Sequence, residues 1–125
     1  MINFAQLRRS FRYALRGLQF VWQNEQNFRV QILIAIGVVI LMLLFGVTLG
    51  EAIILTMMII FVLVLEIVNT IFEKFVDILK PRLHTYVQVI KDMMAAAVLL
   101  ASLGAIVVAS MIFFPYCRQL IQLLQ

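Results

Sequence analysis

Three long apolar runs without a single charge constrain the fold of this chain more than any other feature. They cover residues 30–50, 52–65 and 93–117, and the first and third contain 21 and 25 residues. A helix of about 20 apolar residues crosses the hydrocarbon core of a bilayer, which is about 30 Å thick. With 65% hydrophobic and 13% charged residues, the chain is also far more apolar than a soluble domain. We therefore expect an all-α integral membrane protein.

Three transmembrane helices are expected, at about residues 30–50, 52–79 and 92–115 of a single membrane-embedded domain, 1–125. The second continues in a helical pattern beyond its uncharged part until Pro81 ends or bends it, and Pro115 marks the exit of the third. Lysine and arginine are absent from the loop at 46–51 but frequent before the first helix and between the second and third. By the positive-inside rule, the N-terminus and the second loop are cytoplasmic and the C-terminus lies outside.

An amphipathic helix at about residues 4–22 is expected to lie on the cytoplasmic surface of the membrane. Its apolar residues recur every three or four positions, at Phe4, Leu7, Phe11, Leu15, Leu18 and Trp22. Four arginines lie between them, where they can face lipid phosphates. The excess of ten Lys+Arg over six Asp+Glu is therefore matched to anionic lipids rather than to nucleic acid. A simple positive-inside anchor is the alternative for this segment.

Four polar residues share one face of the second span: Glu66, Asn69, Glu73 and Asp77. At about 100° per residue they fall within a stripe about 80° wide. An ionisable residue inside a membrane costs about 2.5–3.5 kcal/mol on insertion scales, which makes it a candidate functional residue. Three carboxylates on one face need cations, and hard oxygen ligands favour Mg²⁺. The alternative is a salt-bridged, solvated helix end with Lys74 and Lys80 as partners.

Further charged residues are expected at the same membrane level as this stripe. Glu25 precedes the first span, and Lys91 and Asp92 precede the third, so they can converge with the stripe in one site on the cytoplasmic side. A positive-inside charge is the alternative for Lys91. His84 is a single histidine, and we do not expect it to bind a metal. Phosphate-binding glycine loops, protein-kinase motifs and a Ser-His-Asp set are all absent, so a nucleotide would bind without a protein-kinase fold.

The pattern E-x₂-N-x₃-E-x₃-D at 66–77, followed by His84 and by the pair Lys91–Asp92, resembles the signature of the prokaryotic diacylglycerol kinase family. That family includes the Gram-positive undecaprenol kinases, and the resemblance extends to Tyr13 and Glu25 and covers nearly the whole chain. It implies a homotrimeric kinase of the bacterial inner membrane, with active sites between subunits on the cytoplasmic side. It also implies that MgATP phosphorylates a lipid alcohol, either undecaprenol or diacylglycerol.

The resemblance implies a role for each polar residue. Glu66 resembles the catalytic base, and Glu25 and Glu73 resemble the Mg²⁺ ligands. The residues implied to bind or organise ATP are Arg9, Tyr13, Asn69, Asp77, His84, Lys91 and Asp92. The chain departs from the family pattern at Gln6, Gln31 and Gln88, and Gln31 stands where the family has an acidic residue or histidine.

Two alternatives to an undecaprenol kinase stay open. The run at 10–13 and the pair Phe114–Pro115 resemble the undecaprenol branch, but diacylglycerol is the alternative acceptor. A different class is a small non-enzymatic membrane protein, such as a proton-coupled exporter subunit with Glu66 as its proton carrier. That class does not explain why Asn69, Glu73, Asp77 and Lys91 gather at one membrane face.

Overall fold

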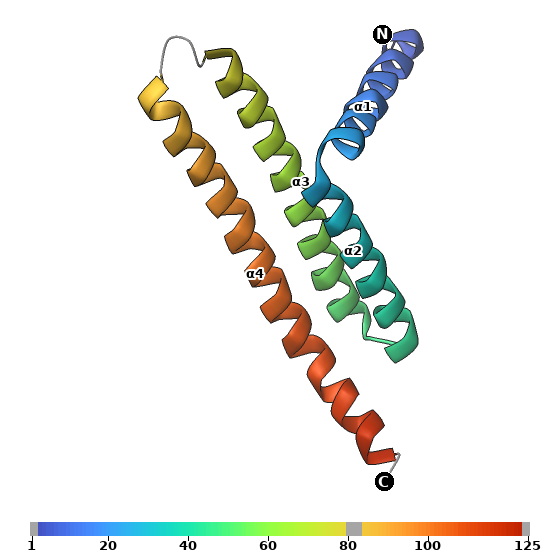
Figure 1. Ribbon diagram of the computed structural model, residues 1–125. Helices are drawn as coiled ribbons and strands as arrows, with labels where there is room; N and C mark the ends of the chain where they lie inside the picture. Colours follow the sequence, from blue (N-terminus) through green and yellow to red (C-terminus); the bar gives the residue numbers. More distant parts are fainter. Residues whose placement is uncertain (1–2, 80–83, 124–125) are drawn as a thin grey trace.

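The protein consists of helices throughout the part that the computed structural model describes, residues 3–79 and 84–123. They are α1 (Phe4–Asn24), α2 (Gln26–Phe45), α3 (Leu49–Leu79) and α4 (His84–Leu123). α2 and α4 both pack against α3, whereas α1 diverges from the bundle at the start of α2 (Figure 1). By length and composition α2, α3 and α4 can each cross a membrane. The expected all-α membrane fold with a separate N-terminal helix is confirmed.

α1 is fixed at both ends by side chains that satisfy its free backbone groups. At its start, Oδ1 of Asn3 accepts hydrogen bonds from the next backbone amides, of residues 5 and 6, at 3.1 and 3.2 Å, which is a helix N-cap. At its end the backbone becomes extended at Glu25. Nη1 of Arg29 then donates to the carbonyls of Trp22 and Gln23, at 3.1 Å each. These two bonds set the angle at which α1 leaves α2.

A capped turn of three residues joins α2 to α3. Gly46 ends α2 with φ 60, in the left-handed region that favours glycine. Thr48 and Glu51 then form a capping box: the Glu51 carboxylate accepts from the Thr48 amide at 2.8 Å, and the Thr48 hydroxyl accepts from the Glu51 amide at 3.4 Å. The expected end of the first span at residue 50 is therefore wrong, because Gly46 stops α2 and residues 49 and 50 begin α3.

α4 is a single helix that continues through Pro115 to Leu123. The expected exit of the third span from the membrane at Pro115 stays a prediction, because a helix can continue beyond the membrane surface. Proline removes one backbone hydrogen bond and disfavours the helix before it, but here side chains on both sides of it are held. The rings of Phe113 and Tyr116 each lie 5.9 Å from that of Phe45 in α2. The Tyr116 hydroxyl also donates to Glu51 at 2.7 Å, so α4 stays attached to the α2–α3 turn beyond the proline.

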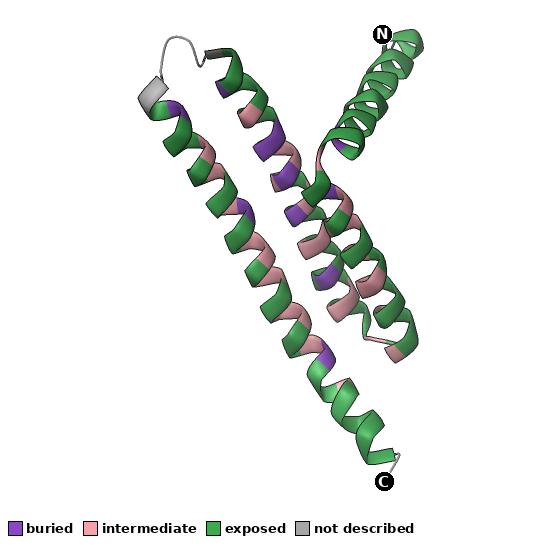
Figure 2. Cartoon of the chain, viewed as in Figure 1, coloured by how far each residue is buried: buried purple, intermediate pink, exposed green. Residues whose placement is uncertain are grey.

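The interior of the protein is narrow and is centred on α3, where most of the buried positions lie (Figure 2). Leu55, Val62 and Val76 are the buried apolar residues of α3, and Glu66 is buried among them with only 2% of its surface exposed. The outer faces of the bundle are apolar and exposed. A bilayer solvates such faces, so the arrangement is stable only where lipid surrounds the bundle.

Candidate functional site

Glu66 is the most deeply buried polar residue of α3, and α2 supplies its side-chain partner. Nε2 of Gln31 donates to Oε2 of Glu66 at 3.1 Å. One turn further along α3, the Thr70 hydroxyl donates to the Glu66 backbone carbonyl at 3.0 Å. A buried carboxylate is stable only if it is hydrogen-bonded. The Gln31 amide therefore contributes directly to keeping Glu66 inside the span.

The next polar pair of the stripe lies towards the end of α3. Nδ2 of Asn69 donates to Oε1 of Glu73 at 3.2 Å. Because the two residues are four positions apart, they lie on the same helical face as Glu66. Glu66 and Glu73 interact electrostatically, and Glu25 at the α1–α2 joint interacts with Glu66 as well. The structure thus places Glu25 and Glu73 within electrostatic range of Glu66.

A cavity of about 300 Å³ opens beside these residues. Its polar lining consists of Asn27, Gln31, Glu66, Asn69, Glu73 and Ser102. Two buried oxygen atoms in this lining, Oε1 of Gln31 and Oδ1 of Asn69, have no hydrogen-bond partner among the described residues. Buried acceptors without partners are rare in proteins, and water, an ion or a polar ligand can satisfy them. The cavity is therefore prepared for a polar ligand.

The donor set of this cavity fits Mg²⁺. The ion prefers carboxylate and amide oxygens, and it is usually held by one or two carboxylates together with substrate phosphates. Glu73 and the unpartnered Oδ1 of Asn69 supply such oxygens. Glu25 is held instead by Lys74, whose Nζ lies 3.6 Å from Oε1 of Glu25. Within residues 3–79 and 84–123, no group of three or more Asp, Glu, His and Cys is close enough to bind a metal; Mg²⁺ commonly completes its coordination with water and substrate phosphates.

Beyond Glu73, the stripe continues as contacts between the ends of α3 and α4. Nζ of Lys91 lies 2.6 Å from Oδ1 of Asp77, which joins the two helices where they approach the loop. Nε2 of Gln88 donates to Asp92 at 2.8 Å along α4. Asp77 and Asp92 are both exposed. Asp77 is thus salt-bridged by Lys91 and not by Lys74, which pairs with Glu25. Lys80, the other partner of the salt-bridge alternative, lies outside the described residues.

Two residues expected at the nucleotide end, both on α1, are not brought to this cavity within one chain. Arg9 and Tyr13 lie on exposed turns of α1, and α1 diverges from α3 and α4 (Figure 1). His84 begins α4, but its side chain lies outside the described part of the chain. The structure therefore places Glu25 and Lys91 next to residues of the stripe, whereas Arg9 and Tyr13 of α1 lie apart from it.

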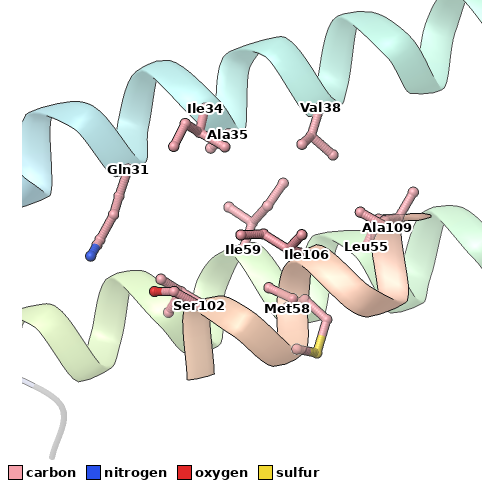
Figure 3. A pocket seen from close by; sticks show the side chains of 12 residues that line it. Gln31, Ile34, Ala35, Val38, Leu55, Met58, Ile59, Ser102, Ile106 and Ala109 are labelled. Atoms are coloured by element: carbon pink, nitrogen blue, oxygen red, sulfur yellow. The ribbon is translucent and has the colours of Figure 1, made fainter. Parts of the chain in front are cut away.

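A second cavity, of about 130 Å³, continues from the polar one between α2, α3 and α4. Gln31 and Ser102 line both cavities. Figure 3 shows Gln31 reaching in from α2 at one end, with Leu55 and Ala109 at the other. Apart from Gln31 and Ser102 its lining is apolar. The polar cavity at Glu66 is therefore continuous with an apolar space that suits a short stretch of hydrocarbon.

Gln31 is the functional candidate that sequence reasoning passed over, because it was noted only as a departure from the family pattern. A stronger signal was available. Gln31 is a primary amide in an otherwise apolar run, and a primary amide inside a membrane needs a partner. The second missed feature is the contact of Tyr116 with Glu51 at the opposite end of the bundle, which no spacing rule could have revealed.

Comparison with known proteins gives two matches. The family model for prokaryotic diacylglycerol kinase matches residues 12–113. A protein from Synechocystis sp. named diacylglycerol kinase is 30% identical over 107 residues, which make up 85% of this chain and 61% of that protein. The chain thus spans about 61% of the length of this curated relative. No solved structure matches.

Proposed function

Because this chain belongs to the prokaryotic diacylglycerol kinase family, we propose that it is a lipid kinase that transfers the γ-phosphate of ATP to the hydroxyl of a membrane lipid alcohol. The proposed acceptor is undecaprenol. The observation that carries the proposal is the position of Glu66, which is buried in the lining of the polar cavity and hydrogen-bonded to Gln31, at the junction of that cavity with the apolar one. A base at such a junction can meet a hydroxyl that arrives from the bilayer while ATP arrives from water.

In the proposed reaction Glu66 is the general base. The oxygen of the lipid alcohol forms a bond to the γ-phosphorus, the bond from that phosphorus to the ADP oxygen breaks, and the hydroxyl proton passes to the Glu66 carboxylate. Glu73, and Glu25 in exchange for its contact with Lys74, would hold Mg²⁺, which when bound neutralises charge on the β- and γ-phosphates. Asn69 holds the Glu73 carboxylate in place through its amide, so the two act together at the phosphate end.

The remaining expected residues are proposed to bind the nucleotide. Lys91 supplies a cation for phosphate oxygens, and its contact with Asp77 holds its side chain at the end of the stripe. Asp92, His84, Arg9 and Tyr13 are proposed to contact the rest of the nucleotide. Since Arg9 and Tyr13 lie on the diverging α1, we further propose that they serve a site shared between subunits of a homotrimer.

The apolar cavity supports undecaprenol as the acceptor. Beyond Gln31, Ser102 is the only side chain lining that cavity that can donate a hydrogen bond, and a polyprenyl chain requires no donor. Diacylglycerol carries two ester carbonyls that would have to be desolvated. The names of the family and of the Synechocystis relative favour diacylglycerol instead, so it is the second candidate. The proposed location is the bacterial inner membrane, with the N-terminus and the site facing the cytoplasm.

The test is phosphorylation by the purified protein in mixed micelles with MgATP, with undecaprenol and dioleoylglycerol offered in parallel. We expect phosphate on undecaprenol, and Glu66→Gln should lower turnover by about 10²- to 10⁴-fold, the usual contribution of a general base. Affinity for MgATP should change little, because Glu66→Gln removes the proposed base and none of the proposed Mg²⁺ ligands. Phosphate on dioleoylglycerol alone would favour the second candidate. Transfer to neither lipid from folded protein would favour the non-enzymatic exporter class.

A further inference from the structure

The nitrogen of the Gln31 side-chain amide takes part in a hydrogen bond, whereas the oxygen does not. Its Nε2 donates to Glu66 at 3.1 Å, while its Oε1 is buried and has no partner among the described residues. The orientation of the amide follows from chemistry, because an ionised carboxylate can only accept and therefore requires the NH₂ group. One carbonyl oxygen in the middle of the site is thus unused while Glu66 is ionised.

The proposed reaction changes what Glu66 requires. Once the carboxylate has taken the proton of the alcohol, it becomes a neutral acid whose O–H is a donor. A buried donor without an acceptor destabilises the state that contains it. The Gln31 amide already contacts Glu66, and it carries a free acceptor at the other end of the same group. Rotation of the terminal amide is soft, because this torsion has a broad, roughly two-fold profile.

We propose that Gln31 is a positioning residue that holds Glu66 in both of its protonation states. Through Nε2 it donates to the carboxylate before transfer, and after a half-turn of the amide it accepts through Oε1 from the neutral acid. This inference rests on the proposed function, because it takes Glu66 as the group that receives the proton. It adds a requirement that the base alone does not have: the partner of Glu66 must be both a donor and an acceptor.

Three substitutions at Gln31 separate this role from a purely structural one. A neutral imidazole carries one donor and one acceptor nitrogen, so Gln31→His keeps both functions. A lysine ammonium has three donors and no acceptor, so Gln31→Lys keeps the contact with the carboxylate and loses the acceptor. Gln31→Met has a similar length and offers only a weak acceptor. Gln26→Met, at an exposed position at the start of α2, is the matched control.

The experiment measures kcat and both KM values for undecaprenol and MgATP in mixed micelles, using variants whose thermal unfolding matches that of the parent protein. We expect Gln31→His to keep kcat within about threefold, and Gln31→Lys to lower kcat by about 10- to 100-fold, the size expected for the loss of one hydrogen bond of a buried acid. Both KM values should stay close to those of the parent in Gln31→His and Gln31→Lys. Gln31→Met should behave like Gln31→Lys, and Gln26→Met like the parent.

Two outcomes would overturn the inference. If Gln31→Lys turns over as fast as Gln31→His, donation to the carboxylate is sufficient and the acceptor has no role. If the substitutions raise KM for the lipid and leave kcat unchanged, Gln31 contacts the substrate rather than the base. These results differ from a failure of the proposed function, in which the parent protein itself would phosphorylate neither undecaprenol nor dioleoylglycerol. If Gln31→Met fails to fold, comparing the kcat of Gln31→His with that of Gln31→Lys still tests the inference.

Discussion

Glu66 and Glu73 lie two turns apart on one helical face, yet their surroundings suit them to different chemistry. Glu66 is enclosed, with 2% of its surface exposed, and its carboxylate accepts a hydrogen bond from a neutral amide. Glu73 is half-buried beside Asn69 and lies nearer the charged end of α3. A desolvated carboxylate favours taking up a proton, whereas one close to water favours a cation and phosphate. The proposed roles of base and metal ligand follow from this difference in depth.

At the residue scale, Glu73→Gln tests the metal assignment. The substitution removes a charged oxygen ligand and keeps the shape of the side chain. We expect the Mg²⁺ concentration that supports half-maximal turnover to rise at least about tenfold, and the KM for MgATP to rise with it. Glu51→Gln makes the same chemical change at the far end of α3 and should leave the Mg²⁺ titration unchanged. An unaltered titration in Glu73→Gln would contradict its role as a ligand.

At the element scale, α4 is held at both ends by polar contacts with α3 and its connections. Lys91 meets Asp77 at the site end, and Tyr116 meets Glu51 at the opposite end. Between these contacts the apolar cavity separates α3 from α4 for part of their length. The two polar contacts therefore matter more for the position of α4 than they would in a tightly packed bundle.

Tyr116→Phe should lower the free energy of unfolding, because it removes one hydrogen bond to a charged group while keeping the ring. The ring contact with Phe45 should persist, and kcat should change little because the site lies at the other end of α3. Unfolding by denaturing detergent in mixed micelles measures the change. Tyr86→Phe, at an exposed position on the same helix, is the control. Equal stability of both variants would show that the Tyr116 contact does not fasten α4.

At the scale of the whole molecule, much of the fold could be predicted because membrane helices obey two simple rules. Uncharged length identified three spans, and the 3.6-residue period placed Glu66, Asn69 and Glu73 on one face. Helix ends were predicted less well. The left-handed Gly46 and the contacts that carry α4 through Pro115 depend on tertiary packing, which a linear pattern does not contain. For the same reason the pairing of Gln31 with Glu66, 35 positions apart in the chain, could not be predicted from spacing.

The crossing of the membrane by α4 can be tested with the single cysteine of the chain. Lys91 and Cys117 are 26 positions apart, which is about 39 Å of helix and more than the hydrocarbon core of about 30 Å. With the site facing the cytoplasm, the exposed Cys117 should react with a membrane-impermeant maleimide added outside sealed cells. In a Cys117→Ser background, Ser10→Cys on the exposed part of α1 should react only after the cells are opened. Labelling of both positions from the same side would contradict three crossings, and a reversed pattern would place the proposed ATP site on the side without ATP.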